Sequence, residues 1–294
     1  MTILGLPFQV LLGQLTIGLI NGCFYALLSL GLAIIFGLLN VINFAHGAFF
    51  MLGALAAWLA LTVGGINYWW ALALAPLVTG LFGVIVERLL LRRLQGLDHL
   101  YSLLFTFGLA LAIEGTVRDI YGTSGLAYPV PPALKGPVDL GFMRLPAYRI
   151  WVVVVALIAC FGTWALIEKT RIGSYLRAGT ENARLVQALG INVPLLVTLT
   201  YGFGVALAGL AGVLAAPIYQ VQPQMGSSML IIIFAVVVIG GLGSTMGTIV
   251  TGLSLGVIEG LAKVFYPQAS STVVFMIMVV VLLLRPAGLF GKEA

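Results

Sequence analysis

Residues 168–195 read EKTRIGSYLRAGTENARLVQALGINVPL, the densest charged stretch of a chain in which only 8% of the residues are charged. The whole chain has 294 residues, of which 61% are hydrophobic, and its mean hydropathy is +1.15. This composition is typical of a polytopic membrane protein. We therefore expect residues 168–195 to form a loop in water between two membrane-spanning helices, and the rest of the chain to lie mostly in the bilayer.

The charged stretch contains the start and stop signals of a short helix. Thr180 can accept a hydrogen bond from the N–H groups of a first turn, and Glu181 would lie at the positive end of the helix dipole. Gly190 can adopt the left-handed conformation that ends a helix, and Pro194 prevents its continuation. The expected helix is amphipathic and therefore suited to lie against another surface. Its apolar side would carry Leu185, Val186 and Leu189, and its polar side Glu181, Arg184 and Gln187.

Apolar runs elsewhere in the chain predict an all-α fold, since a spanning helix takes about 20 apolar residues. We expect a single transmembrane domain, residues 1–294, with about eight to ten transmembrane helices. The number of helices is given as a range because residues 10–63 are compatible with two long spans or three short ones. Small residues at four-residue spacing, which allow helices to approach closely, form two rows: Gly204, Ala208, Gly212 and Ala216, and then Thr248, Gly252, Gly256 and Gly260.

Charged and proline-rich segments between the apolar runs give the orientation. Basic residues favour the cytoplasmic side of a membrane, and they occur in residues 87–93, in residues 168–195 and at Arg285. The proline-rich loop 115–149 is then expected to be periplasmic. This distribution also explains the net charge of +5, so the basic balance implies a membrane lipid surface and no nucleic-acid partner.

Two of the apolar runs are interrupted by polar residues and glycines. Irregular backbone at membrane depth requires protein or a water-filled cavity around it, so both interruptions predict broken or re-entrant helices that line a translocation pathway. The candidate pathway residues are Asn40, Asn43 and His46 at the first break, and Gly240, Gly241, Gly243 and Ser244 at the second. His46 can be interpreted either as a cap of the broken helix or as a pathway residue. One histidine and two amides are a poor ligand set, so we predict no metal site.

The residues before the two breaks are alike and suggest an internal repeat. Ile34-Ile35-Phe36 precedes the first break, and Ile232-Ile233-Phe234 precedes the second. Each is followed by a glycine and polar break and by another apolar run. Transporters are often built from such repeats.

Catalytic and nucleotide-binding motifs are missing from the sequence. The run GGLGSTMG, residues 240–247, lacks the Gly-Lys-Ser/Thr of a phosphate-binding loop. There is no Ser/His/Asp order, no HExxH motif and no Cys/His cluster. The chain is therefore expected not to be an enzyme and to bind no cofactor. Cys23 and Cys160 lie in apolar runs and are expected to be packing residues, while Glu259 and Lys263, four residues apart, are expected to form an ion pair.

Three segments in the same order resemble the LivH-type permease of branched-chain amino acid ABC importers. They are INFAHG at residues 42–47, ALGIN at residues 188–192 and GGLGS at residues 240–244, the last followed by Gly247. Ala48 stands where the family often has an acidic residue, and Met246 stands where it often has proline. These two departures leave the fold unaffected and the exact substrate open.

The resemblance implies the fold of an ABC importer permease and a set of partner proteins. The partners are a second related permease, two cytoplasmic ATPase subunits that use the ATP, and a periplasmic substrate-binding protein, assembled at the bacterial cytoplasmic (inner) membrane. The predicted helix would then be the ATPase-coupling helix. Its residues would be Thr180, Glu181, Arg184, Leu185, Leu189 and Gly190. Closure of the ATPases would rearrange the broken helices around Asn43 and Gly240.

Two other functions are open alternatives. An ABC permease for urea or short-chain amides has the same general features. A proton-coupled secondary transporter would instead use Glu114, Glu259 or His46 as a proton relay and would work alone.

Overall fold

The computed structural model describes the chain except for residues 1, 4–5, 40–42, 95 and 292–294. Its helices are α1 (Phe8–Leu39), α2 (His46–Thr62), α3 (Tyr68–Val86), α4 (Arg92–Leu94), α5 (His99–Tyr121), α6 (Ala147–Lys169), α7 (Arg171–Glu181), α8 (Ala183–Ala188), α9 (Val193–Tyr219), α10 (Met225–Gly240), α11 (Thr245–Phe265) and α12 (Ser270–Leu284). A π-helical turn, η1 (Glu87–Leu91), joins α3 to α4, and two 3-10 turns are η2 (Pro132–Leu134) and η3 (Pro267–Ala269). Two short antiparallel pairs complete the fold: β1 (Thr2–Ile3) with β2 (Leu6–Pro7), and β3 (Pro137–Asp139) with β4 (Arg144–Pro146).

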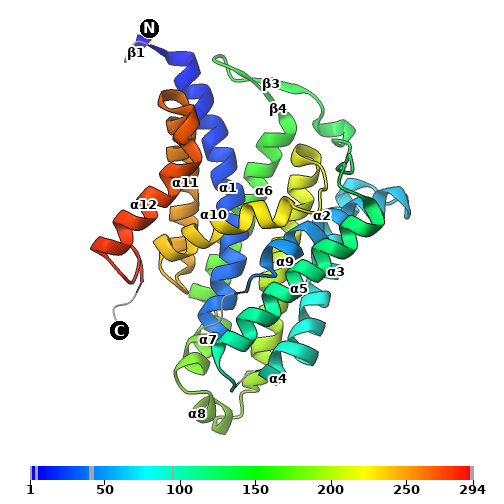
Figure 1. Ribbon diagram of the computed structural model, residues 1–294, viewed down its shortest axis with the longest axis vertical. Coiled ribbons are helices and arrows are strands. Elements are labelled where there is room, and N and C mark those ends of the chain that lie inside the picture. The colour runs from blue at the N-terminus through cyan, green and yellow to red at the C-terminus, as the bar shows by residue number, and fades with distance from the viewer. Residues whose placement is uncertain (1, 4–5, 40–42, 95, 292–294) are drawn as a thin grey trace.

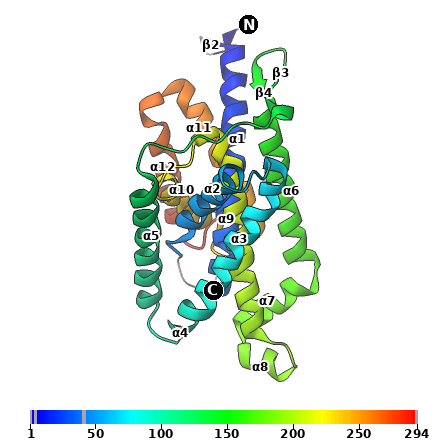
Figure 2. The same ribbon diagram turned by 90° about the vertical axis from the view of Figure 1, so that its right-hand side faces the viewer.

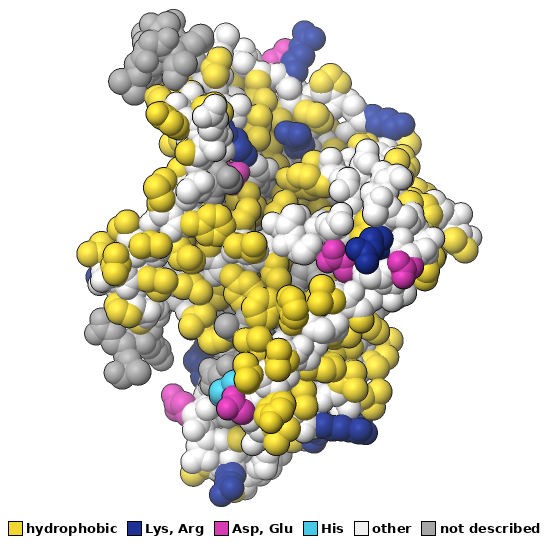
Figure 3. Space-filling view, in the orientation of Figure 1, with side chains coloured by type: hydrophobic (Ala, Val, Ile, Leu, Met, Phe, Trp, Pro, Cys, Tyr) yellow, Lys and Arg dark blue, Asp and Glu magenta, His cyan; other side chains and the backbone are white. Residues whose placement is uncertain are grey.

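The predicted all-α membrane fold is confirmed. In the part of the chain that the structure describes, six helices are long and apolar enough to cross a membrane, and three shorter apolar helices accompany them. The long ones lie within α1, α3 to α4, α5, α6, α9 and α11, and the short ones are α2, α10 and most of α12. Figure 3 shows a face dominated by hydrophobic side chains, as a protein surrounded by lipid requires.

Residues 10–63 form one long and one short helix. α1 has 32 residues and continues through Gly31, while α2 has only 17. The helix is not interrupted at Gly31 because that glycine lies where α1 crosses α9: a Cβ atom added there would lie 2.5 Å from the carbonyl oxygen of Gly204. Glycine is therefore needed for close packing at this point and does not end the helix.

The chain contains a repeat of opposite orientation. α1 and α9 run in opposite directions, as Figures 1 and 2 show, and each continues into a short helix, α2 or α10. α11 packs along α1 as α3 packs along α9, so α1–α2–α3 corresponds to α9–α10–α11. The repeat therefore pairs the break before α2 with the turn before α10. This correspondence differs from the predicted one, which paired the first break with the Gly240 break.

The two predicted rows of small residues are confirmed as packing surfaces, since all eight residues are buried. The row on α11 lies against α1, where a Cβ atom on Gly18 would lie 2.6 Å from the carbonyl oxygen of Gly256. Side chains of ordinary size would force the two helices apart. The row on α9 packs in the same way against α1 and α2.

Replacing Gly256 by leucine is expected to destabilise the fold, because the new side chain would collide with the backbone of α1. Overpacking of this kind costs typically about 1–3 kcal/mol, and more where only backbone faces the new atoms. Thermal unfolding of the purified protein measures the effect as a lower Tm. Gly162→Leu on α6 is the matched control, since nothing lies within 4 Å of a Cβ atom there. Equal Tm values for the two variants would contradict the close packing of α1 and α11.

The loop expected at residues 115–149 is shorter in the structure. α5 continues past Glu114 to Tyr121, and α6 begins at Ala147. Polar residues such as Arg118 do not end a helix that lies at a surface. The helix ends at Gly122, whose φ of 76° is left-handed and suits glycine.

Candidate functional site

The first predicted break lies between α1 and α2, and its polar residues hold the chain to other helices. Asn40 lies outside the described residues, whereas Asn43 is buried. The Asn43 Nδ2 group donates to the hydroxyl oxygen of Tyr201 on α9 at 3.0 Å, and its Oδ1 atom accepts from the backbone N–H of Ala45 at 3.1 Å. The Asn43 side chain therefore caps the loop before α2 and fastens it to α9.

His46, the first residue of α2, is fully buried. Its Nε2 atom lies 2.9 Å from the backbone carbonyl oxygen of Leu28 on α1. A carbonyl oxygen can only accept a hydrogen bond, so the proton is assigned to Nε2. Nδ1 has no hydrogen-bond partner among the described residues. His46 thus connects the start of α2 to the middle of α1 and does not line the large cavity described below.

A cavity of about 370 Å³ lies at the end of the molecule where α4, α7 and α8 gather (Figure 1). Its aliphatic wall includes Ile35, Leu91, Leu94, Leu97, Val193 and Val197. Its polar lining consists of amide, hydroxyl and imidazole side chains: Asn43, His99, Ser102, Thr106, Gln187 and Tyr201. Thr106 and Tyr201 lie two helical turns inward from the starts of α5 and α9, so together with Asn43 they form the inner end of the cavity.

The second predicted break is confirmed as a break, but it lies away from the cavity. α10 ends at Gly240, and Gly241 and Gly243 have left-handed φ values of 99° and 79°. Ser244 begins α11 by accepting a hydrogen bond from the N–H of Gly247 at 3.1 Å. The C-terminal segment covers this break, because the N–H of Phe290 donates to the carbonyl oxygen of Gly240 at 3.2 Å.

Gly243 lies beside the end of α1 and near α7. It borders a crevice of about 80 Å³ together with Gly37 of α1 and Arg177 and Thr180 of α7. The structure therefore does not bring the six described candidate pathway residues together. Among those that it describes, only Asn43 lines the large cavity.

The charged stretch, residues 168–195, forms two helices where one was predicted. Thr180 and Glu181 lie in the last turn of α7, and Thr180 Oγ1 donates to the carbonyl oxygen of Arg177 at 2.7 Å. The prediction of Thr180 as a helix cap is therefore wrong. The cap is Asn182, whose Oδ1 atom accepts from the N–H of Leu185 at 3.0 Å, as is common for asparagine at this position.

The predicted end of this helix is confirmed. Gly190 has a φ of 84°, in the left-handed region. The N–H of Gly190 donates to the carbonyl oxygen of Gln187, and the N–H of Ile191 donates to that of Val186. These bonds satisfy the last carbonyl groups of α8, after which Pro194 lies in the first turn of α9.

The apolar residues of α8 are divided between two environments. Val186 is buried, whereas Leu185 is 61% exposed and Leu189 is 74% exposed. Arg184 and Glu181 are exposed beside them. α8 lies at the lower tip of the molecule in Figures 1 and 2, and Leu189 follows its last residue, Ala188.

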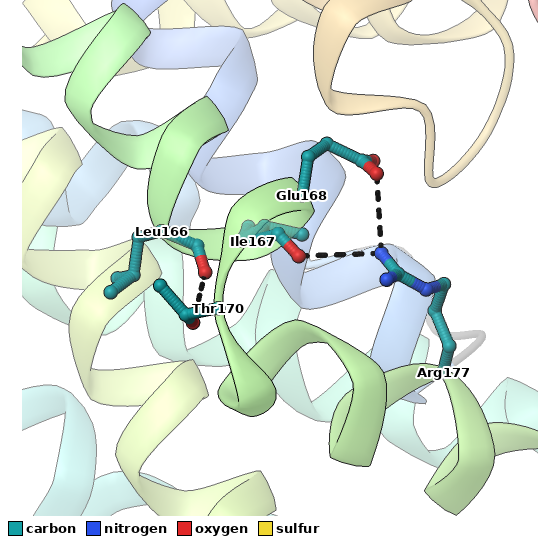
Figure 4. A network of polar contacts seen from close by, with 5 residues as sticks. All are labelled: Leu166, Ile167, Glu168, Thr170 and Arg177. Carbon is teal, nitrogen blue, oxygen red and sulfur yellow. Dashed lines mark hydrogen bonds and ion pairs between the residues drawn. The ribbon is translucent and has the colours of Figure 1, made fainter.

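α7 is fastened to the end of α6, as Figure 4 shows. The guanidinium group of Arg177 donates to the carbonyl oxygen of Ile167 at 3.3 Å and lies 3.4 Å from the carboxylate of Glu168. On the other side, Gly179, Ala183 and Gln187 of the α7–α8 segment line the large cavity. The α7–α8 segment therefore contacts the end of α6 and also forms part of the cavity wall.

Tyr201 and Glu87 are buried residues with hydrogen-bond partners on other elements, and no sequence motif marks either of them. Tyr201 lies in the middle of α9 and is buried, as is Glu87 in the π-helical turn η1. The hydroxyl group of Thr198 on α9 donates to the Glu87 carboxylate at 2.5 Å. Neither residue belongs to a motif, and each acquires its role from a partner far away in sequence.

Replacing Tyr201 by phenylalanine is expected to lower the stability of the protein. The Nδ2 group of Asn43 would remain buried without its acceptor, and a buried unsatisfied polar group costs about 1–3 kcal/mol. Thermal unfolding should show a lower Tm for Tyr201→Phe and an unchanged Tm for Tyr266→Phe, whose side chain is exposed. An unchanged Tm for both variants would show that the Asn43–Tyr201 bond contributes nothing.

Residues proposed for a proton relay are separated in the structure. The Glu259–Lys263 ion pair is confirmed at 2.7 Å, and Glu259 also accepts from the hydroxyl group of Tyr25 at 2.7 Å. Glu114 lies on α5 and His46 on α2, and no hydrogen bond among the described residues links the three. Cys23 and Cys160 are free and buried, as predicted. The described residues contain no cluster of three or more His, Cys, Asp or Glu side chains.

Comparisons with known proteins show which family the chain belongs to. Residues 14–283 match the family described as branched-chain amino acid transport system / permease component. The chain is 33% identical to the high-affinity branched-chain amino acid transport system permease protein BraD of Pseudomonas aeruginosa, over 96% of each chain. It is 29% identical to the corresponding protein LivH of Escherichia coli, over 97% of each chain.

A second group of permeases is also similar. The chain is 26% identical to the permease protein LivM of Salmonella typhimurium, over 96% of this chain and 71% of LivM. No solved structure matches the chain significantly. The family match covers nearly the whole chain, and it agrees with the all-α fold and with the three motifs. The chain therefore belongs to the family of permease components of branched-chain amino acid transport systems.

Proposed function

We propose that this chain is the permease subunit of an ATP-driven ABC importer that moves branched-chain or other hydrophobic amino acids across the bacterial inner membrane. The names of its relatives support the substrate class. The observation that carries the mechanism is the α7–α8 segment, which presents exposed Leu185 and Leu189 at one end of the molecule and lines the cavity with Gln187.

The partner proteins are inferred from the missing nucleotide-binding motif and from the exposed position of α8. Its sequence has no nucleotide-binding motif, so ATP hydrolysis requires separate cytoplasmic ATPase subunits, for which α8 is the docking element. Two ATPases require two permeases, and the similarity of the chain to both LivH and LivM fits a pair of related permeases. A periplasmic binding protein would deliver the substrate.

The α8 segment acts as the coupling element in this proposal. Nucleotide-driven closure of the ATPases would move Leu185 and Leu189. Arg177 would transmit the movement to α6, and Ala183 and Gln187 would transmit it to the cavity wall. The same short helix would dock on the ATPase and form part of the cavity wall. Closure of the ATPases and rearrangement of the cavity would then be coupled without a long chain of intervening residues.

Aliphatic side chains around the cavity favour amino acids over urea or short-chain amides. Leu91, Leu94 and Val197 can contact an aliphatic substrate side chain, whereas a urea molecule would leave these residues without a partner. The separation of Glu114, Glu259 and His46 argues against a proton relay.

Substrate specificity is tested by uptake into vesicles that contain the permease with its partner subunits and binding protein. Labelled leucine, isoleucine and valine should accumulate, and labelled urea and acetamide should not. Accumulation of urea or acetamide without leucine would contradict the proposed substrate class.

A further inference from the structure

We propose that the Asn43–Phe44 loop is the cytoplasmic gate of the translocation pathway and that the cavity below it is the release chamber for an amino acid with an aliphatic side chain. This inference rests on the proposed import function and adds the residues that close the pathway. It is carried by three observations: the chemistry of the cavity, the hydrogen bonds at its inner end and the aromatic contacts of Phe44.

The cavity has the chemistry of a weak site for a zwitterion with an apolar side chain. Aliphatic residues from η1, α4 and α9 form one part of its lining, and neutral amide and hydroxyl groups form the other. No Asp, Glu, Lys or Arg side chain is among the described residues that line it. Such groups can hydrogen-bond an ammonium and a carboxylate group without holding either strongly, as release requires.

Two helices hold the inner end of the cavity closed by hydrogen bonds to Asn43 and Phe44, two residues of the connection before α2. Asn43 is bonded to Tyr201 of α9, and the backbone N–H of Phe44 donates to Thr106 Oγ1 of α5 at 3.3 Å. The loop therefore bridges α5 and α9 at the end of the cavity. Separation of these two helices would have to break one of the two bonds.

The Phe44 ring forms the apolar part of the closure. Its centroid lies 6.0 Å from that of Phe107 on α5 in an edge-to-face arrangement and 5.2 Å from that of Phe234 on α10. Phe44 does not line the cavity, although both Asn43 and Thr106 do. The ring therefore lies behind the polar inner end, where it joins α5 to the short helix α10.

α5 is the element most free to open this closure. It is the least buried of the six long apolar helices, with 17% of its apolar window buried inside the molecule. It packs mainly against α2 and contributes Phe107, Thr106 and Ser102 to the gate and the cavity. The α7–α8 segment lies on the wall of the same cavity, so movement of α8 can change the distance between α5 and α9.

The gate is tested with the complete complex reconstituted in proteoliposomes that are loaded with labelled leucine. Phe44→Ala should increase leucine efflux in the absence of ATP by about tenfold, because both aromatic contacts that close the gate are lost. Phe107→Ala should increase it less, since the contact with Phe234 remains. Phe161→Ala is the matched control on the exposed surface of α6 and should leave efflux unchanged.

Labelling of a cysteine at position 44 provides a second readout that does not depend on a leak. Cys23 and Cys160 are buried, so background reaction with a membrane-impermeant maleimide should be small. Phe44→Cys should be protected in the absence of ATP and labelled from the cytoplasmic side during turnover. Leu97→Cys, at an exposed residue that lines the cavity, should be labelled in both conditions.

The possible results distinguish failure of the proposed gate from failure of the proposed import function. Normal ATP-driven uptake by the wild-type complex, with no leak in Phe44→Ala and equal labelling of Phe44→Cys in both conditions, would overturn the gate alone. Absence of ATP-driven uptake by the wild-type complex would instead overturn the proposed function.

Discussion

Replacing Leu185 and Leu189 together by serine is expected to abolish ATP-driven amino acid uptake while the permease still folds in the membrane. Both side chains are mostly exposed at the tip of the molecule, so their removal creates no internal cavity. Burying a leucine side chain contributes about 1.5–3 kcal/mol. Loss of two leucines from an interface should therefore weaken ATPase binding by about 100-fold or more.

Association of the ATPase with membranes that contain the variant permease measures this effect, with uptake as the second readout. Val138→Ser combined with Leu140→Ser is the matched control, since both are exposed apolar residues in or next to β3, at the opposite end of the molecule from α8. The control should retain most ATPase binding. Full ATPase binding by Leu185→Ser/Leu189→Ser would show that α8 is only a solvated connection.

Replacing Gly190 by valine is expected to uncouple ATP hydrolysis from transport. Gly190 has a φ of 84°, and a β-branched side chain strongly resists this left-handed conformation. Nothing lies within 4 Å of a Cβ atom at this position, so the effect would come from backbone strain and not from a collision. The end of α8 would change direction, and the two leucines would no longer be presented in the same way.

The ratio of amino acid transported to ATP hydrolysed measures the coupling. We expect it to fall at least severalfold in Gly190→Val, with normal insertion of the protein. Gly190→Asn is the matched control, because asparagine tolerates the left-handed region far better than valine. If both variants couple normally, the geometry after α8 has no role in transport.

Features that depend on local sequence could be predicted well. The apolar runs gave the membrane fold, because burying a helix in lipid requires only length and hydrophobicity. Gly190 ends its helix as expected, and Gly241 and Gly243 lie in the expected break, since a left-handed residue needs only its own backbone. The Glu259–Lys263 pair follows from helical spacing alone.

Features that depend on distant residues could not be predicted. Asn182, and not Thr180, caps α8 because residues 171–181 already form α7 and Thr180 lies in its last turn. Tyr201 and Thr106 join the candidate site only because α9 and α5 lie beside the loop at Asn43. The Gly240 break was placed in the pathway, but the C-terminal segment covers it.

The central claim is that this chain transports amino acids only with an ATPase partner, and uptake into proteoliposomes tests it most directly. Leucine uptake should require the ATPase subunits and enclosed ATP, and vanadate should stop it. Leucine uptake by this chain alone, driven by a proton gradient and insensitive to vanadate, would contradict the claim.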